Sequence, residues 1–278
     1  MKIKEILQRD PAAHPLINQG QARITDRQNE RAMLELHGEL STFVCEGQYA
    51  DGIEKIIRSF IDNLSRTNQR GAWVSGFFGS GKSHLLKMLC HLWQDTEFSD
   101  GATARSLVPS MPEELGALLR ELDVAGKRAG GLLAAAGSLP SGTTDNVRIT
   151  ILGILLRATG LPEQYPQAKF CLWLHSQGHY ENVKSAIEAA GKSFARELNN
   201  LYVSGPIARA VIDCDPAFAS GEAEAKQLIK AQFPPQTSDI TTQEFLQTVK
   251  DALALVSHDG RMPCTLIVLD EVQQYIGE

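Results

Sequence analysis

Apolar residues recur with a helical period in three stretches of the first third of the chain. The clearest is Ile53–Leu64, where apolar side chains occupy positions i, i+3, i+4, i+7, i+8 and i+11 and form one continuous stripe. Weaker stripes run through Met33–Leu40 and Leu85–Trp93. Each stretch predicts an amphipathic helix that buries one face.

Short apolar runs predict strands at several places. Gln21–Ile24 and Phe43–Cys45 are weak candidates on either side of the first helix, and Ala72–Ser75 precedes a glycine-rich segment. Gly130–Gly137 is typical of a buried strand, although so short a run also fits a helix. Thr265–Leu269 combines β-branched residues with leucine and predicts another buried strand.

The rest of the chain predicts mostly helices. Their candidate ranges are Pro112–Leu122, Asn146–Thr159, Gln167–Ser176, Glu181–Leu201, Pro206–Cys214 and Thr242–Val256. Gly160-Leu161-Pro162 is a normal helix stop, and the proline-containing segment Phe233–Ser238 breaks the helical pattern.

Composition narrows the class of protein. The chain has 278 residues, 43% of them hydrophobic and 22% charged, as is typical of globular proteins. A net charge of −6 indicates no strongly basic nucleic-acid-binding surface. Five scattered cysteines without a C-x-x-C pair favour reduced thiols. Because neither a signal peptide nor a bilayer-length apolar stretch is visible, we expect a cytoplasmic protein that does not span a membrane.

The glycine-rich segment Gly76–Ser83 matches the full phosphate-loop (Walker A) pattern G-x-x-x-x-G-K-[ST]. Its glycines permit backbone angles that turn successive N–H groups toward a phosphate, and the following helix presents its positive end to the same anion. Lys82 would contact the β- and γ-phosphates of ATP, and Ser83 would bind Mg²⁺. The alternative without a binding role is a glycine-rich turn with a solvated lysine. The predicted nucleotide-binding residues are Gly76, Phe77, Phe78, Gly79, Ser80, Gly81, Lys82, Ser83 and His84.

A second motif follows the Thr265–Leu269 run. A buried strand that ends in Asp270-Glu271 is the Walker B arrangement, in which Asp270 would hold Mg²⁺ and Glu271 would polarise the attacking water. Lys82 and Glu271 are therefore the predicted catalytic residues. The alternative is an ordinary strand followed by an acidic pair that begins a helix.

Together the two motifs predict an α/β fold of the P-loop NTPase, AAA+-like kind, with a parallel sheet flanked by helices. Because the motifs lie far apart in the chain, we expect a helical insertion between them. The predicted segments are an N-terminal preamble with short strands at 1–50, the first part of an ATPase core at 51–141, a helical insertion at 142–241 and the Walker B part of the core at 242–278.

Three stretches resemble one family. Gly76–Lys87, Gly130–Gly137 and Leu269–Gly277 are similar to the BrxC/PglY family of P-loop ATPases from bacteriophage exclusion (BREX) systems. The resemblance implies a role in bacterial antiviral defence, ATP and Mg²⁺ as ligands, and Lys82, Ser83, Asp270 and Glu271 as site residues. It also implies partners: a DNA methyltransferase, a PglZ-type protein, small BREX proteins, DNA contacted through the complex, and further copies of the full-length chain.

Members of that family are much longer, so the resemblance predicts that this sequence is an N-terminal fragment with an incomplete core. The polar sensor, arginine finger and C-terminal lid of such ATPases are absent from it. We therefore expect it to bind ATP but to hydrolyse it poorly, since arginines supplied in trans contribute about 10³–10⁵ in rate in comparable enzymes. Two alternatives stay open: an assembly module with a structural nucleotide site, and a DNA-loading AAA+ ATPase.

Overall fold

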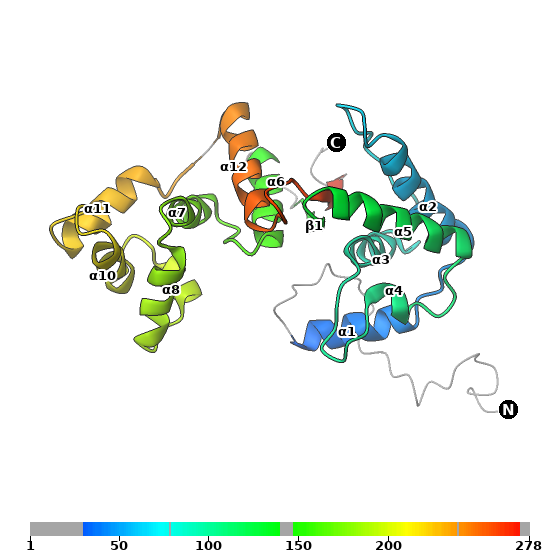
Figure 1. Ribbon diagram of the computed structural model, residues 1–278, viewed down its shortest axis with the longest axis horizontal. Helices are drawn as coiled ribbons and strands as arrows, with labels where there is room; N and C mark the ends of the chain where they lie inside the picture. Colours follow the sequence, from blue (N-terminus) through cyan, green and yellow to red (C-terminus); the bar gives the residue numbers. More distant parts are fainter. Residues whose placement is uncertain (1–29, 78, 140–146, 238, 273–278) are drawn as a thin grey trace. The chain divides into compact units, whose positions relative to one another are not determined.

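The computed structural model describes residues 30–77, 79–139, 147–237 and 239–272 (Figure 1). The chain forms two compact units. Unit 1 contains the residues up to Ala136 together with Cys264–Asp270, and unit 2 contains Gly137–Pro263 and the residues from Glu271 onward. The candidate strand Gln21–Ile24 lies outside the described residues, and the four-segment division made from the sequence stays a prediction.

Unit 1 is built on helices that bury one apolar face each. Its helices are α1 (Glu30–Ser41), α2 (Gly47–Asp62), α3 (Lys82–Gln94), α4 (Ala104–Leu107) and α5 (Glu113–Arg128). Figure 1 shows α2, α3 and α5 packed together. Their buried side chains, among them Ile53, Ile57, Met88, Leu92 and Leu119, form one core.

Local sequence explains where two of these helices begin. α4 starts at a capping box, in which the Thr103 hydroxyl accepts from the Ser106 N–H and the Ser106 hydroxyl accepts from the Thr103 N–H. α5 follows Pro112, with Glu113 and Glu114 in its first turn and basic residues in its last. Charges so placed complement the helix dipole.

Two strands pair beside this helical core. β1 (Leu132–Ser138) and β2 (Cys264–Asp270) form a two-stranded parallel sheet, and β2 packs on α3. Gln94, the last residue of α3, accepts a hydrogen bond from the Ala134 N–H over 3.1 Å. The Gly130–Gly137 and Thr265–Leu269 runs are thus confirmed as strands.

The predicted fold class is wrong. Helices make up 59% of the structure, and in its described part the sheet has only these two strands, so an AAA+-like parallel sheet flanked by helices is not formed. Neither Phe43–Cys45 nor Ala72–Ser75 is a strand. A run this short becomes a strand only beside a neighbouring edge and a buried face. Trp73, at the centre of the second run, is instead 71% exposed.

Unit 2 is helical. Its helices are α6 (Val147–Ala158), α7 (Tyr165–Ser176), α8 (Tyr180–Ala189), α9 (Phe194–Asn199), α10 (Gly205–Cys214), α11 (Glu222–Gln232) and α12 (Thr242–Leu255). Their inward side chains, including Phe170, Leu174, Ile187, Ile207 and Ile229, make a separate core. Within the described residues, no helix of either unit is long and apolar enough to cross a membrane.

One predicted helix of unit 2 is divided. Glu181–Leu201 forms α8 and α9, because Gly191 takes φ +71° and its N–H and that of Lys192 bond back to the carbonyls of Glu188 and Ile187. This left-handed glycine ends α8. The Ser193 hydroxyl then accepts from the Arg196 N–H and begins α9.

Candidate functional site

The glycine-rich loop leads directly into α3. Gly79 and Gly81 have φ values of +75° and +82°, and Gly81 is the N-cap residue of α3. Glycine adopts this left-handed region without the steric cost that a side chain adds. The predicted loop–helix junction is therefore present, with helix N-terminus and glycines in the expected order. Phe78 lies outside the described residues.

Gly76 lies at a close approach within the loop. A Cβ atom at this position would lie 2.8 Å from the Ser80 Oγ. The Ser80 N–H in turn donates to the Phe77 carbonyl over 3.2 Å. A side chain at Gly76 would therefore displace the Ser80 hydroxyl from its present position.

Lys82 reaches back over the loop that precedes it. Its Nζ donates to the Gly76 carbonyl over 2.9 Å and to the Phe77 carbonyl over 2.8 Å. The ammonium is exposed to solvent, and within the described part of the chain its hydrogen-bond partners are these two neutral carbonyls. A phosphate oxygen would form a stronger, charge-assisted bond with the same group.

The first turn of α3 presents amide N–H groups. The Leu85 N–H donates to the Gly81 carbonyl over 2.9 Å, which closes the first turn. Among the described residues, no backbone carbonyl accepts from the N–H of Ser83 or His84. Such N–H groups and the helix dipole together favour an anion at this end.

Tyr49, at the start of α2, contacts the loop from one side. Its hydroxyl donates to the Ser80 carbonyl over 3.0 Å. A Cβ on Gly81 would lie 1.9 Å from the same hydroxyl oxygen. The sequence pattern carried no sign of this role, because a tyrosine in the first turn of an amphipathic helix is ordinary.

His84, in the first turn of α3, packs its ring against an aromatic side chain. Its ring lies edge-on to Phe43, with centroids 5.6 Å apart, and Phe43 also contacts Tyr49. Burial lowers the pKa of His84 below its ordinary value. The imidazole of His84 therefore packs against Phe43, and its part in nucleotide binding stays a prediction.

A buried ion pair holds α3 on α1. Lys87 Nζ lies 2.6 Å from Glu39 Oε2, with side chains only 1% and 7% exposed. A pair so well buried fixes the rotation of α3 about its axis, because either charge alone would be costly in the core. The helix that carries Lys82 and Ser83 thus has a defined orientation.

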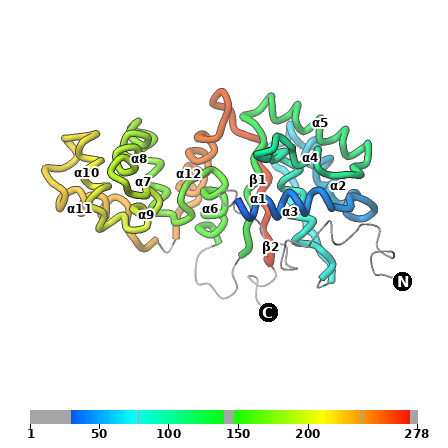
Figure 2. Tube along the Cα trace, turned by 90° about the horizontal axis from the view of Figure 1, so that it is seen from below, coloured from blue at the N-terminus to red at the C-terminus, as the bar shows by residue number. Residues whose placement is uncertain are grey.

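Asp270 is the last residue of β2 and is half-buried. The Trp93 indole donates to the Cys264 carbonyl over 3.1 Å, which places the end of α3 beside the start of β2. Figure 2 shows β2 beside α3 in unit 1. Glu271 follows with φ +58° and an exposed side chain.

These residues suit Mg²⁺ only together with a phosphate ligand. In the described part of the chain, no three His, Cys, Asp or Glu side chains are grouped so that they could hold a metal ion. Mg²⁺ on nucleotides is typically held by one or two protein oxygens, with phosphate and water supplying the others. The Ser83 hydroxyl and the Asp270 carboxylate are the two such oxygens that the sequence motifs supply, and their joint binding of Mg²⁺ stays a prediction.

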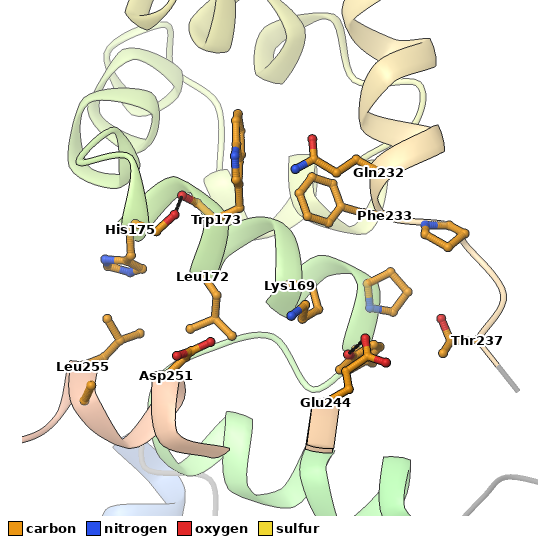
Figure 3. Close-up of a pocket in the computed structure, with 15 residues that line it drawn as sticks. Lys169, Leu172, Trp173, His175, Gln232, Phe233, Thr237, Glu244, Asp251 and Leu255 are labelled. Carbon is orange, nitrogen blue, oxygen red and sulfur yellow. Dashed lines mark hydrogen bonds between the residues drawn. The ribbon is translucent and has the colours of Figure 1, made fainter. Parts of the chain in front are cut away.

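Unit 2 contains a groove of about 830 Å³ between α7, α12 and the segment after α11 (Figure 3). Trp173 and Phe233 line it with ring centroids 6.0 Å apart. The Tyr165 hydroxyl donates to Glu244 Oε1 over 2.6 Å, and burial with this bond raises the pKa of Tyr165. The groove carries no recognised motif, so the loop before α3 is the stronger candidate site.

No protein-family model matches the chain, and no solved structure matches it.

Proposed function

We propose that this chain binds Mg²⁺-ATP at the loop Gly76–Ser83. The observation that carries the proposal is the complete G-x-x-x-x-G-K-S motif at the N-terminus of α3, with left-handed backbone at Gly79 and Gly81. The alternative, a glycine-rich turn with a solvated lysine, predicts no binding of Mg²⁺-ATP, and the titration described below distinguishes the two.

Lys82 is the group that would change partners when nucleotide binds. In the structure its ammonium bonds the carbonyls of Gly76 and Phe77. A triphosphate at the loop would draw the ammonium onto its β- and γ-oxygens, and the N–H groups of the loop and first helical turn would bind the same anion. Opposite charge then replaces a neutral contact, which favours the bound state.

ATP hydrolysis is the second part of the proposal. Asp270 would share Mg²⁺ with Ser83, and Glu271 would accept a proton from the attacking water. Mg²⁺, when bound, would neutralise the charge that develops on the phosphates. The sequence motif and the position of Asp270 at the end of β2 support this assignment.

The biological setting remains a prediction from the three stretches that resemble the BrxC/PglY family. On that reading the chain couples its nucleotide state to the assembly or action of a BREX defence complex on DNA. An assembly module with a structural nucleotide site is the main alternative, and it differs in predicting binding without turnover.

Calorimetric titration with Mg²⁺-ATP tests the proposal. Lys82→Ala should weaken binding by at least about 100-fold, because two charge-assisted contacts are lost. Lys127→Ala, which removes an exposed lysine at the end of α5, should bind as the unmodified chain does. Equal affinity of the unmodified chain and Lys82→Ala would reject the site.

A further inference from the structure

We propose that Tyr49 is a positioning residue of the phosphate loop, whose hydroxyl holds the Ser80 carbonyl so that neighbouring N–H groups stay free for phosphate. The inference rests on the proposed nucleotide site and adds a residue outside its motif. Tyr49 precedes the motif by more than twenty residues and belongs to a different helix. The contact joins its hydroxyl to the Ser80 carbonyl over 3.0 Å.

The peptide group between Ser80 and Gly81 has a defined orientation. The Ser80–Gly81 peptide is trans, so the Ser80 carbonyl and the Gly81 N–H point in opposite directions. Because the carbonyl points to Tyr49 on α2, the Gly81 N–H points away from α2. Among the described residues, none accepts a hydrogen bond from that N–H. Its direction, set by the Ser80 carbonyl, makes it a candidate donor to an anion at the loop.

The Tyr49 hydroxyl and the His84 N–H are alternative donors to the Ser80 carbonyl. Were α3 to extend toward the loop, this carbonyl would be the i−4 partner of the His84 N–H. The structure has no such bond, and the carbonyl accepts from Tyr49 instead. Tyr49 thereby keeps the first turn of α3 open, with the His84 N–H outside the helical ladder.

The packing around Tyr49 gives its hydroxyl a fixed position. Its ring lies edge-on to Phe43, with centroids 6.2 Å apart and planes 80° apart. α2 is anchored in the core of unit 1 through Ile53 and Ile57, which are fully buried. The hydroxyl also fills the space that a Cβ on Gly81 would need, since the two atoms would be 1.9 Å apart. Tyr49 and Gly81 therefore act as a matched pair.

Tyr49→Phe is the direct test, since it keeps the ring on Phe43 and removes only the hydroxyl. Binding should weaken about 3- to 10-fold, the loss expected for one neutral hydrogen bond. The factor should be the same for Mg²⁺-ATP and Mg²⁺-tripolyphosphate, because the loop amides contact phosphate and not the base. Tyr202→Phe removes a hydroxyl in unit 2 that has no hydrogen-bond partner among the described residues, and should leave both affinities unchanged.

A double-mutant cycle tests the contact between Tyr49 and Gly81. A folding defect that only one of the two changes causes does not alter the coupling free energy that the cycle measures. Gly81→Ala should weaken tripolyphosphate binding and lower the unfolding midpoint. In the Tyr49→Phe background the same change should cost less, because the hydroxyl that the new methyl would meet is gone, leaving Cζ at 3.1 Å. Additive effects would overturn the assigned pair.

The outcomes separate this inference from the function on which it rests. If Lys82→Ala binds tripolyphosphate as tightly as the unmodified chain, the nucleotide site itself fails. If Lys82→Ala loses binding but Tyr49→Phe retains full affinity for both ligands, only the role of Tyr49 fails. Equal losses of ATP and tripolyphosphate affinity in Tyr49→Phe, with an unchanged unfolding midpoint, would support it.

Discussion

The Trp93 indole N–H donates to the carbonyl oxygen of Cys264 over 3.1 Å and ties the end of α3 to the start of β2. The two residues are 171 positions apart in the sequence, and the Gly137–Pro263 part of unit 2 is inserted between them. Because Trp93 is 1% exposed, both the indole and this hydrogen bond are shielded from water. The contact fixes β2 relative to the helix that carries the glycine-rich loop.

Trp93→Phe should destabilise the chain by about 2 kcal/mol, since it leaves a buried carbonyl without its partner and a small cavity beside Phe60. Urea unfolding followed by circular dichroism measures the change. Trp73→Phe is the matched control, because Trp73 is 71% exposed and should change stability by less than about 0.5 kcal/mol. Similar losses in both variants would contradict the buried role of Trp93.

Lys87→Met should be more damaging, because it leaves the Glu39 carboxylate buried without its cation. Breaking a buried pair from one side typically costs about 3–5 kcal/mol. Lys87→Met with Glu39→Leu should recover most of that loss, since no charge then stays in the core. Arg58→Met removes the largely exposed Arg58–Glu54 pair on α2 and should cost less than about 1 kcal/mol. Urea unfolding of the three variants and the unmodified chain distinguishes these cases.

Helices were predictable where one face is buried. Most of the Ile53–Leu64 stripe lies in α2, although α2 starts earlier, at Gly47, and ends at Asp62, before Leu64. Thr265–Leu269 is confirmed within β2, because its β-branched residues fit a strand that pairs with β1. The prediction of a strand at Ala72–Ser75 was wrong: Val74 packs against the core, but Trp73 is exposed, so the run has no continuous buried face.

The candidate site was predictable only as far as a local motif extends. The loop before α3 follows from glycine spacing, and its left-handed residues are those of the motif. Tyr49 and the Lys87–Glu39 pair were not predictable, because each contact joins residues far apart in sequence. A buried lysine in an apolar stripe was the one available sign, since Lys87 falls between the predicted core positions of α3.

Acid should destabilise unit 1 partly through His84. Burial lowers the pKa of His84 below its ordinary value of 6.5, so between the two values the unfolded chain binds more protons than the folded chain. Stability therefore rises with pH through that window and is lost as pH falls toward the lowered pKa. Unfolding free energies measured between pH 5 and 7 should show this slope.

His84→Gln should reduce the slope without removing it. The pKa of His175 in unit 2 is also lowered, chiefly by burial, and contributes a slope of the same sign. His84→Gln with His175→Gln should therefore flatten the profile further than either change alone. A slope that is identical in His84→Gln and the unmodified chain would show that His84 titrates alike in both states.

Glu271→Gln should separate ATP binding from ATP hydrolysis. The amide is close in shape to the carboxylate but cannot accept the proton of an attacking water, so turnover should fall by about 10²–10⁴ while Mg²⁺-ATP affinity is kept. Asp270→Asn should instead raise the Mg²⁺ concentration needed for half-maximal turnover, because it removes a carboxylate ligand. Phosphate release measured against Mg²⁺ concentration distinguishes the two variants.

Glu188→Gln, on the exposed side of α8, is the matched control and should hydrolyse ATP at the unmodified rate. Unchanged turnover in Glu271→Gln would remove that residue from the hydrolytic role, whereas binding without turnover in the unmodified chain would favour the structural nucleotide site.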